Sequence, residues 1–340
     1  MKTKQKTIWF DFTNVPHVNF LYPIIKHFSE FNHIYTIRDF AETKQLFEKV
    51  IDKPYLLIGS HKGKNKIRKV LGSIVRIIPL QKQVPRFDVK ISVGGDASSI
   101  VAKLRGKLSI TFDDNERAPN WRYSKFSDLA FWPEVIDRNV LYKQGFRADK
   151  LFQYPGFKED LYIADYKPDE EFLSTLPFKK YVVVRPENIN ANYVSSSSGS
   201  IVPELLELLN GLNQNILFLP RYKDDINYAK KISNIFIPDK ALNGLDVCYY
   251  SDAVFTGAGT MAREAACMGV PAFSFYTGKE LLTVDKKMIE QNWMFFSRDP
   301  ELLIEQYLST EKRLANLSNS TKVKDLIIKK LEEFLAKSKL

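Results

Sequence analysis

A short loop in the second half of the chain combines residue types that suit a phosphate ligand. Residues 254–275 read VFTGAGTMAREAACMGVPAFSF, which predicts a strand over 253–255, a loop, a helix and a second strand. The loop comprises Thr256, Gly257, Ala258, Gly259 and Thr260. Glycines let backbone amides approach a ligand closely, and the first amides of a helix are unpaired and favour an anion. The alternative is a tight turn without a ligand.

Four side chains in and near that loop could extend such a site. Thr260 could cap the helix or bond a ligand, and Glu264, one turn later, could reach the hydroxyls of a ribose. Arg185 and Arg221 follow the predicted strands 181–184 and 215–219. Ligands of open parallel sheets bind at the carboxyl ends of strands, where arginines can grip a phosphate in bidentate fashion. Each arginine alone could be a solvated loop residue, but together with the loop they predict an anion site.

Short apolar runs alternate with helical stretches, which predicts parallel sheets covered on both faces. The expected strands of the first half are 7–12, 34–37, 55–58, 89–93, 109–112 and 129–131, and those of the second half are 181–184, 215–219, 235–237, 253–255 and the run after Pro271. We therefore expect an α/β fold of two doubly wound, Rossmann-like domains, over 1–160 and 166–320. An amphipathic helix within 321–340 would close the chain.

Composition is that of a soluble globular protein, with 44% apolar and 26% charged residues among 340. No apolar run nears the roughly 18 residues of a membrane span, and no signal-peptide core follows the basic start, so a cytoplasmic location is expected. Cys248 and Cys267 lack metal-ligand spacing and are expected to be reduced. The net charge of +10 lies in residues 1–165, with 28 basic against 18 acidic residues, whereas residues 166–340 carry 22 of each. This excess serves solubility or attracts an anionic partner.

Four motifs, in this order, resemble the domain-of-unknown-function family 354, a family of predicted glycosyltransferases. They are IWFDFTNVPH at 8–17, VVRP at 183–186, LPRY at 219–222 and GAGTMAREA at 257–265. The family is similar in turn to two-domain GT-B glycosyltransferases and to non-hydrolysing UDP-N-acetylglucosamine 2-epimerases. That resemblance implies a GT-B-like fold, with two Rossmann-like domains facing each other across a cleft and a nucleotide-sugar held by the C-terminal domain.

The resemblance also implies roles for residues of the second domain. Gly257 to Thr260 would meet the diphosphate, Glu264 the ribose, and residues 238–246 (PDKALNGLD) would lie near the base. Epimerases of this kind use a histidine after the first strand of the second domain, where this chain has Arg185-Pro186-Glu187. Glycosyl transfer is therefore the first expectation. It needs a bound donor, a stabilised leaving diphosphate and one base, and no metal or other cofactor.

Four candidates for the catalytic acid or base stand at strand ends of the first domain, and the first is Asp11, which closes the strand 7–12. His17 resembles a histidine found near the corresponding loop of GT-B transferases with lipid-linked acceptors, and imidazole is a suitable base for a hydroxyl. It could equally hydrogen-bond its own loop. Asp96, after Gly94-Gly95, resembles a catalytic aspartate of the epimerases, but it could be a plain N-cap. Glu116 ends the acidic run 113–116 and is expected to face the cleft.

The acidic run has two further expectations. Asp113 or Asn115 would order the loop through bonds from side chain to backbone. A metal site is not expected, because no histidine or further oxygen ligand is near. Crowded acids raise one another's pKa, which suits a carboxyl group that transfers protons.

Residues 62–78 combine basic and apolar residues at helical spacing. Six apolar residues fall on one face of this predicted helix, namely Ile67, Val70, Leu71, Ile74, Val75 and Ile78. That face either packs on the sheet or lies on an anionic membrane. Peripheral contact with the inner membrane face, or with a lipid-linked acceptor, is the partner expected from it. No nucleic-acid module is recognisable.

The sequence thus predicts a metal-independent GT-B-type glycosyltransferase that uses a UDP-sugar, in surface polysaccharide or glycolipid synthesis. The alternative enzyme is a nucleotide-sugar epimerase, which needs no acceptor. A third possibility is a non-catalytic nucleotide-sugar-binding protein, which would lose nothing on substitution of His17, Asp96 or Glu116.

Overall fold

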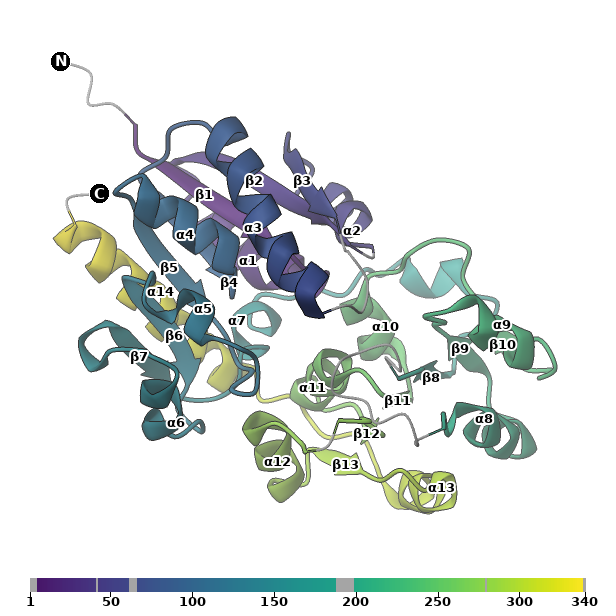
Figure 1. The fold of residues 1–340 in the computed structure, drawn as a ribbon. Coiled ribbons are helices and arrows are strands. Elements are labelled where there is room, and N and C mark those ends of the chain that lie inside the picture. The colour runs from purple at the N-terminus through teal and green to yellow at the C-terminus, as the bar shows by residue number, and fades with distance from the viewer. Residues whose placement is uncertain (1–4, 41, 61–65, 188–198, 279, 339–340) are drawn as a thin grey trace. The chain divides into compact units, whose positions relative to one another are not determined.

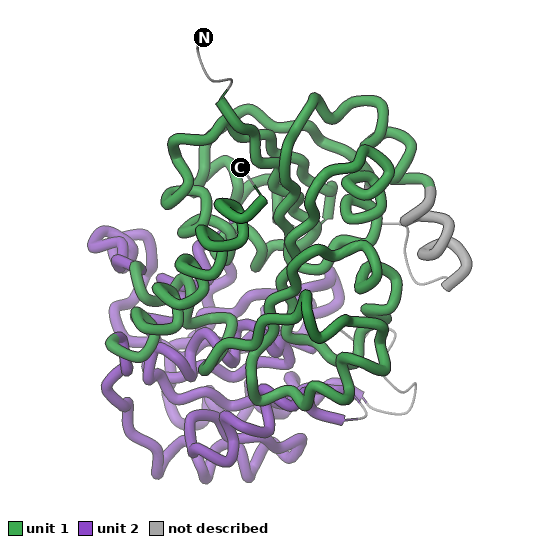
Figure 2. Tube along the Cα trace, turned by 90° about the vertical axis from the view of Figure 1, so that its left-hand side faces the viewer, with its two compact units in different colours: residues 1–165, 318–340 green, residues 166–317 purple. Residues whose placement is uncertain are grey.

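The chain folds into two compact units (Figures 1 and 2). The structure, a computed structural model, describes residues 5–40, 42–60, 66–187, 199–278 and 280–338. Unit 1 comprises residues 1–165 and 318–340, and unit 2 comprises residues 166–317. Within the described ranges, no helix has the length and apolar content needed to cross a membrane.

Unit 1 is built on one parallel sheet with the strand order β3-β2-β1-β4-β5-β6-β7. Its strands are β1 (Thr7–Phe12), β2 (Asn32–Asp39), β3 (Leu56–Ser60), β4 (Val89–Val93), β5 (Leu108–Phe112), β6 (Leu129–Pro133) and β7 (Leu151–Tyr154). Its helices are α1 (Pro16–His27), α2 (Thr43–Val50), α3 (Lys66–Gln83), α4 (Asp96–Leu104), α5 (Trp121–Ser124), α6 (Arg138–Lys143) and α7 (Asp160–Ile163), joined by most of α14 (Leu317–Lys337).

Unit 2 repeats this plan with the strand order β10-β9-β8-β11-β12-β13, again all parallel. Its strands are β8 (Val182–Arg185), β9 (Ile216–Phe218), β10 (Ile235–Phe236), β11 (Ala253–Thr256), β12 (Ala272–Ser274) and β13 (Met294–Phe296). Its helices are α8 (Val202–Gly211), α9 (Lys223–Ala229), α10 (Gly244–Tyr250), α11 (Gly259–Cys267), α12 (Thr283–Glu290) and α13 (Pro300–Ser309). The expectation of two doubly wound, Rossmann-like domains is confirmed.

Alternation along the strands sends side chains to the two faces of each sheet. In β1, Trp9 packs in a cluster with α3 and α4 residues such as Leu80 and Val101, and these two helices lie side by side (Figure 1). Phe10 and Phe12 contact Tyr35 of β2 instead, and Phe12 also contacts Phe47 of α2. The sheet is thereby buried on both sides.

The strand order fixes where each unit can hold a ligand. The order in which strands are added to the sheet reverses between β1 and β4 in unit 1, and between β8 and β11 in unit 2, although all strands stay parallel. Open α/β sheets bind ligands at such switch points, at the carboxyl ends of the strands. The loops that follow these four strands carry His17, Asp96, Arg185 and the 256–260 loop, while Arg221 and the acidic run 113–116 follow the neighbouring strands β9 and β5.

Candidate functional site

The loop between β11 and α11 has unpaired backbone amides. They begin at Gly259 and not at Gly257, where the sequence predicted the first of them. The N–H of Gly257 donates to the Arg185 carbonyl at 3.1 Å, and that of Ala258 donates to Thr256 Oγ1 at 2.9 Å. Helix α11 begins at Gly259. In the described part of the chain, the N–H groups of Gly259, Thr260 and Met261 have no acceptor. Three unpaired amides at the positive end of a helix dipole are a suitable place for an anion.

Gly257 is a glycine because of its protein neighbour. A Cβ at this position would lie 2.6 Å from the Cα of Glu187. Glu187 is buried and accepts bonds from Arg298 Nη1 at 3.3 Å and from Ser200 Oγ at 2.7 Å. The loop after β8 therefore packs directly against the loop after β11. Sequence reasoning missed this contact, because nothing near residue 257 in the chain indicates it.

Thr260 does not cap the helix, so that alternative is wrong. The N-cap is Ala258, because the helix begins one residue before Thr260. Thr260 Oγ1 instead accepts a bond from Arg263 Nη2 at 3.4 Å. Arg263 is buried and pairs with the buried Asp285 at 2.8 Å. This pair ties the first turn of α11 to α12, and Arg263 reads in the sequence as an ordinary helical residue.

The two predicted arginines follow neighbouring strands, as expected. Arg185 ends β8, and Arg221 follows β9, which pairs with β8. The Nε of Arg221 donates to the Pro186 carbonyl at 2.7 Å, and its amide donates to Asp225 Oδ2 at 2.8 Å. Arg221 thereby joins the two loops and brings a positive charge to the switch point of unit 2.

Glu264 is buried on α11 and faces the start of α10. Its Oε2 lies 3.9 Å from the position of a Cβ on Gly244, the first residue of α10. Asn243 caps that helix by accepting a bond from the Leu245 amide at 3.2 Å. The structure thus brings Glu264 to the segment 238–246, which the family resemblance links to the base.

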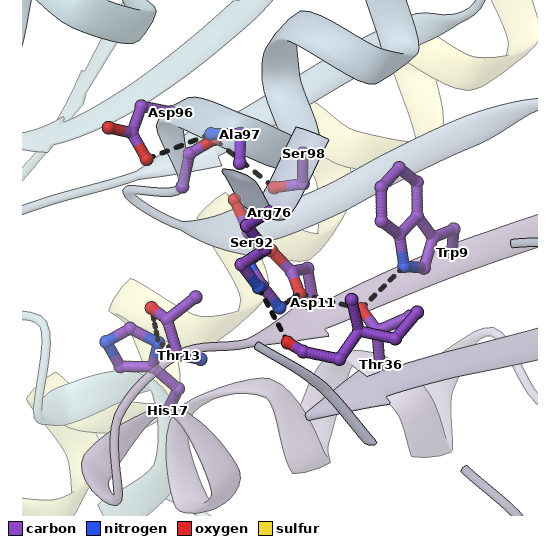
Figure 3. A network of polar contacts seen from close by, with 12 residues as sticks. Trp9, Asp11, Thr13, His17, Thr36, Arg76, Ser92, Asp96, Ala97 and Ser98 are labelled. Atoms are coloured by element: carbon purple, nitrogen blue, oxygen red, sulfur yellow. Dashed lines mark hydrogen bonds and ion pairs between the residues drawn. The ribbon is translucent and has the colours of Figure 1, made fainter. Parts of the chain in front are cut away.

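In unit 1, the geometry of His17 does not suit the expected base (Figure 3). The Thr13 amide lies 3.4 Å from its Nδ1 and donates to it, and Thr13 Oγ1 lies at 3.3 Å. Because Nδ1 accepts, the neutral ring carries its proton on Nε2. Burial, and next the charge of Lys158, lower the pKa of His17 to about 3, although Asp11 and Asp114 oppose them. His17 is therefore a neutral ring that holds its own loop by accepting the Thr13 N–H.

Asp96 is the first residue of α4, and its Oδ1 accepts the Ala97 amide at 2.9 Å. The N-cap position belongs to Gly95, which has a φ of 95°. A side chain there would also collide with Ser92 and Ser98, whose Oγ atoms lie 2.8 Å from the Cβ position. The N-cap alternative for Asp96 is therefore wrong, and its half-buried carboxylate stands at the switch point of unit 1.

Asp113 is the acid that stands at a strand end, directly after β5. Its Oδ1 accepts the amides of Asp114 and Asn115 at 2.9 and 3.0 Å, which confirms that it orders the loop. Its Oδ2 accepts the Tyr123 hydroxyl at 2.7 Å. Burial, and next the charge of Asp114, raise the pKa of Asp113 to about 6 against that hydrogen bond. A carboxyl group with this pKa can both take and give a proton near neutral pH.

Asp113, rather than Glu116, lies next to the loop that carries Asp96. Oδ2 of Asp113 lies 3.3 Å from the position of a Cβ on Gly94, two residues before Asp96. Glu116 lies three residues further along, with its carboxylate 4.0 Å from Arg117 Nε and its carbonyl bonded to Gln144. The position directly after the strand was the signal in the sequence that favours Asp113 over Glu116.

A buried ion pair near the end of β1 joins this strand to α3 (Figure 3). Arg76 Nη1 and Nη2 donate to Asp11 Oδ2 and Oδ1 at 2.9 and 2.6 Å, and Thr36 Oγ1 donates to Oδ1 at 2.6 Å. Burial alone would raise the pKa of Asp11, but the charge and bonds of Arg76 lower it to about 2. Asp11 is thus a fixed carboxylate, and its role is to anchor α3 to β1.

Solved structures similar to this chain include two UDP-N-acetylglucosamine 2-epimerases and one glycotransferase. The UDP-GlcNAc 2-epimerase of Methanocaldococcus jannaschii, solved with UDP-GlcNAc and UDP, superposes with a TM-score of 0.69 at 18% identity over 94% of this chain and 99% of its own. The UDP-N-acetylglucosamine 2-epimerase of Rickettsia bellii gives 0.67 at 17% identity, over 97% and 98%. The glycotransferase of kitacinnamycin gives 0.59 at 10% identity, over 95% of each chain. At these identities the likeness establishes the GT-B-like fold.

Sequence comparison places the chain in a family. An uncharacterized protein of Methanocaldococcus jannaschii is 28% identical over 312 residues, which cover 87% of this chain and 89% of that protein. A family model described as "Protein of unknown function (DUF354)" matches residues 6–336, nearly the whole chain. The chain therefore belongs to the DUF354 family.

Proposed function

We propose that this protein is a glycosyltransferase that binds a UDP-sugar in unit 2 and transfers the sugar to an acceptor hydroxyl. The observation that carries the proposal is the set of three unpaired amides at Gly259, Thr260 and Met261, at the switch point where Arg185 and Arg221 also stand. Amides and guanidinium groups in this arrangement bind a diphosphate and stabilise it as a leaving group. The UDP-bound epimerase of the same fold supports a uridine nucleotide as the ligand.

In this proposal Glu264 binds the ribose hydroxyls, and a carboxylate of unit 1 acts on the acceptor. The acceptor oxygen forms a bond to the anomeric carbon while the bond from that carbon to the diphosphate breaks. The acceptor proton passes to the base, and Asp113 suits this role because its pKa of about 6 lies near the working pH of the cell. Asp96, beside it, would orient the acceptor. Surface polysaccharide or glycolipid synthesis is the setting we propose.

Calorimetry with UDP, GDP, CMP and their sugar conjugates tests the donor site. We expect one nucleotide, UDP, to bind, and Glu264→Ala and Arg221→Ala each to weaken binding at least about tenfold. Arg221→Lys keeps the positive charge but loses the bidentate guanidinium group, so its affinity should lie between those of the unmodified protein and Arg221→Ala. Glu207→Ala, at an exposed position of α8, is the matched control and should bind like the unmodified protein. Absence of binding to every nucleotide would refute the proposal.

The second candidate is a nucleotide-sugar epimerase, favoured by the near-complete superposition on epimerase structures. Against it, the position of their catalytic histidine is occupied here by the segment that ends in Glu187, which is buried and bonded to Arg298. Proton NMR of the protein with its UDP-sugar separates the two reactions. Epimerisation without an acceptor would establish the second candidate, whereas a stable sugar that is consumed only on addition of an acceptor supports transfer.

A further inference from the structure

Helix α3 packs on the sheet of unit 1 with an arginine inward and apolar side chains outward. Arg76 is 6% exposed, because the buried Asp11 carboxylate requires its charge in the core. Val75 and Ile78, by contrast, are 49% and 57% exposed. A helix that only covers a core shows the opposite pattern. The expectation that the apolar face of this helix packs on the sheet is therefore wrong for these two residues, while Leu80 and Val84 do pack inward.

The neighbouring helix exposes a further apolar residue. Leu104, in the last turn of α4, is 66% exposed. Helices α3 and α4 lie side by side on unit 1 (Figure 1). Arg105 fastens their ends together, because its Nη1 donates to the Val84 carbonyl at 2.9 Å. The outer surface of this helical layer, which we call the α3–α4 face, thus carries three exposed aliphatic side chains.

The same part of the chain is strongly basic. Residues 53–87 contain six lysines and three arginines and no aspartate or glutamate. Lys62 and Lys64 of this stretch lie outside the described residues. A pocket of about 690 Å³ lies where α3 ends and β4 begins, and Lys6, Arg86, Arg105, Lys107 and one acid, Asp88, line it. Within the described chain, the side chains of Lys6 and Arg86 form no ion pair.

We propose that the α3–α4 face binds the surface of an anionic lipid bilayer. Val75 and Ile78 would enter the boundary between head groups and acyl chains, and the basic pocket would contact lipid phosphates. An anionic lipid surface uses both features, because its acyl boundary takes up aliphatic side chains and its head groups attract basic residues, whereas a soluble polyanion gives exposed aliphatic side chains nothing. The proposal stands apart from the sugar chemistry, since it involves no residue of the proposed donor site.

Flotation of the full-length protein with vesicles tests this. Vesicles of phosphatidylcholine alone are compared with vesicles that also contain about one third phosphatidylglycerol, at low and high salt. We expect binding to the anionic vesicles only, weakened by salt. Val75→Ser/Ile78→Ser should lower the affinity about tenfold, and Arg86→Gln about fivefold. Leu308→Ser is the matched control, because Leu308 of α13 is equally exposed, at 66%, but lies in unit 2.

A spectroscopic readout reports insertion directly. A cysteine placed at Ile78 can carry an environment-sensitive fluorophore, because the native Cys248 and Cys267 are buried. Anionic vesicles should shift the emission of this label to shorter wavelength and leave a label at Leu308 unchanged. The proposal is overturned if the protein does not bind anionic vesicles at low salt. It is also overturned if the Val75→Ser/Ile78→Ser variant binds like the unmodified protein. That result would mean that the protein binds the vesicles by charge alone, as it would bind a soluble polyanion such as nucleic acid or heparin.

Discussion

The Cα of Glu187 lies 2.6 Å from the place that a Cβ of residue 257 would occupy. Since the clash is with backbone, Gly257→Ala forces the β8 and β11 loops apart. We expect a loss of about 1–3 kcal/mol in the free energy of unfolding, together with weaker UDP binding. Urea unfolding and calorimetry measure the two effects. Gly211→Ala is the control, because nothing lies within 4 Å of its Cβ position. Equal stability of both variants would contradict this packing.

Replacing Asp11 by Asn leaves the Arg76 guanidinium buried without its counter-charge. We expect a cost of about 3–5 kcal/mol in the free energy of unfolding, and a smaller cost for the double variant Asp11→Asn/Arg76→Met. Asp149→Asn breaks the exposed pair with Arg147, whose side chains are 59% and 70% exposed, and should leave the stability almost unchanged. Urea unfolding followed by tryptophan fluorescence suits the measurement, because Trp9 joins the same network through Thr36.

The pH dependence of that pair follows from the pKa of Asp11. Its folded value of about 2 lies below the ordinary 3.8, so the ion pair contributes its full stability above pH 4. The contribution is lost as the pH falls toward 2. The difference in unfolding free energy between the unmodified protein and Asp11→Asn should therefore shrink over this interval. A difference that stays constant down to pH 2 would mean that Asp11 is not a buried carboxylate.

The sequence was sufficient for the layout of the fold because strand and helix periods alternate clearly. It missed two short edge strands, β7 with four residues and β13 with three, although the two-residue edge strand β10 was predicted. In the site, strand ends located Arg185, Arg221 and Asp96. Contacts between distant segments, such as Gly257 with Glu187, leave no local signal. The inward turn of Arg76 was also hidden, because its partner Asp11 lies 65 residues away.

Lys90 is fully buried in β4 and donates to Ser99 Oγ at 2.8 Å. Burial lowers the pKa of Lys90 from 10.5 to about 7. Between these values the unfolded chain binds the extra proton, so folding stability should rise with pH. Lys90→Met should stabilise the protein at pH 7 and below and remove this rise, whereas Lys103→Met, at an exposed position of α4, should change little. Urea unfolding at pH 6.5 and 9 checks the prediction. It would be disproved if the free energy of unfolding of Lys90→Met rose with pH as steeply as that of the unmodified protein.

The ionised carboxylate of Asp113 should lower the stability of the folded protein and yet be required for sugar transfer. Its folded pKa of about 6 lies above the ordinary 3.8, so stability should fall as the pH rises through this interval. Asp113→Asn is therefore expected to be more stable than the unmodified protein at pH 8 and yet inactive in sugar transfer. Glu116→Gln is the matched control, and we expect it to retain most activity if Asp113 is the base.

Tyr123→Phe tests the same carboxyl group without removing it. The Tyr123 hydroxyl lies 2.7 Å from Asp113 Oδ2 and lowers the pKa of that carboxyl group. Loss of the hydroxyl should raise the pKa further, so the acid side of the pH–rate profile should move to higher pH. Carbon NMR of the aspartate carboxyl groups would show the same shift without any assay of activity. If Asp113 takes the acceptor's proton, the NMR titration and the pH–rate profile must report the same pKa. A shift in the NMR titration without a shift in the pH–rate profile would therefore show that Asp113 titrates as a buried acid but is not the catalytic base.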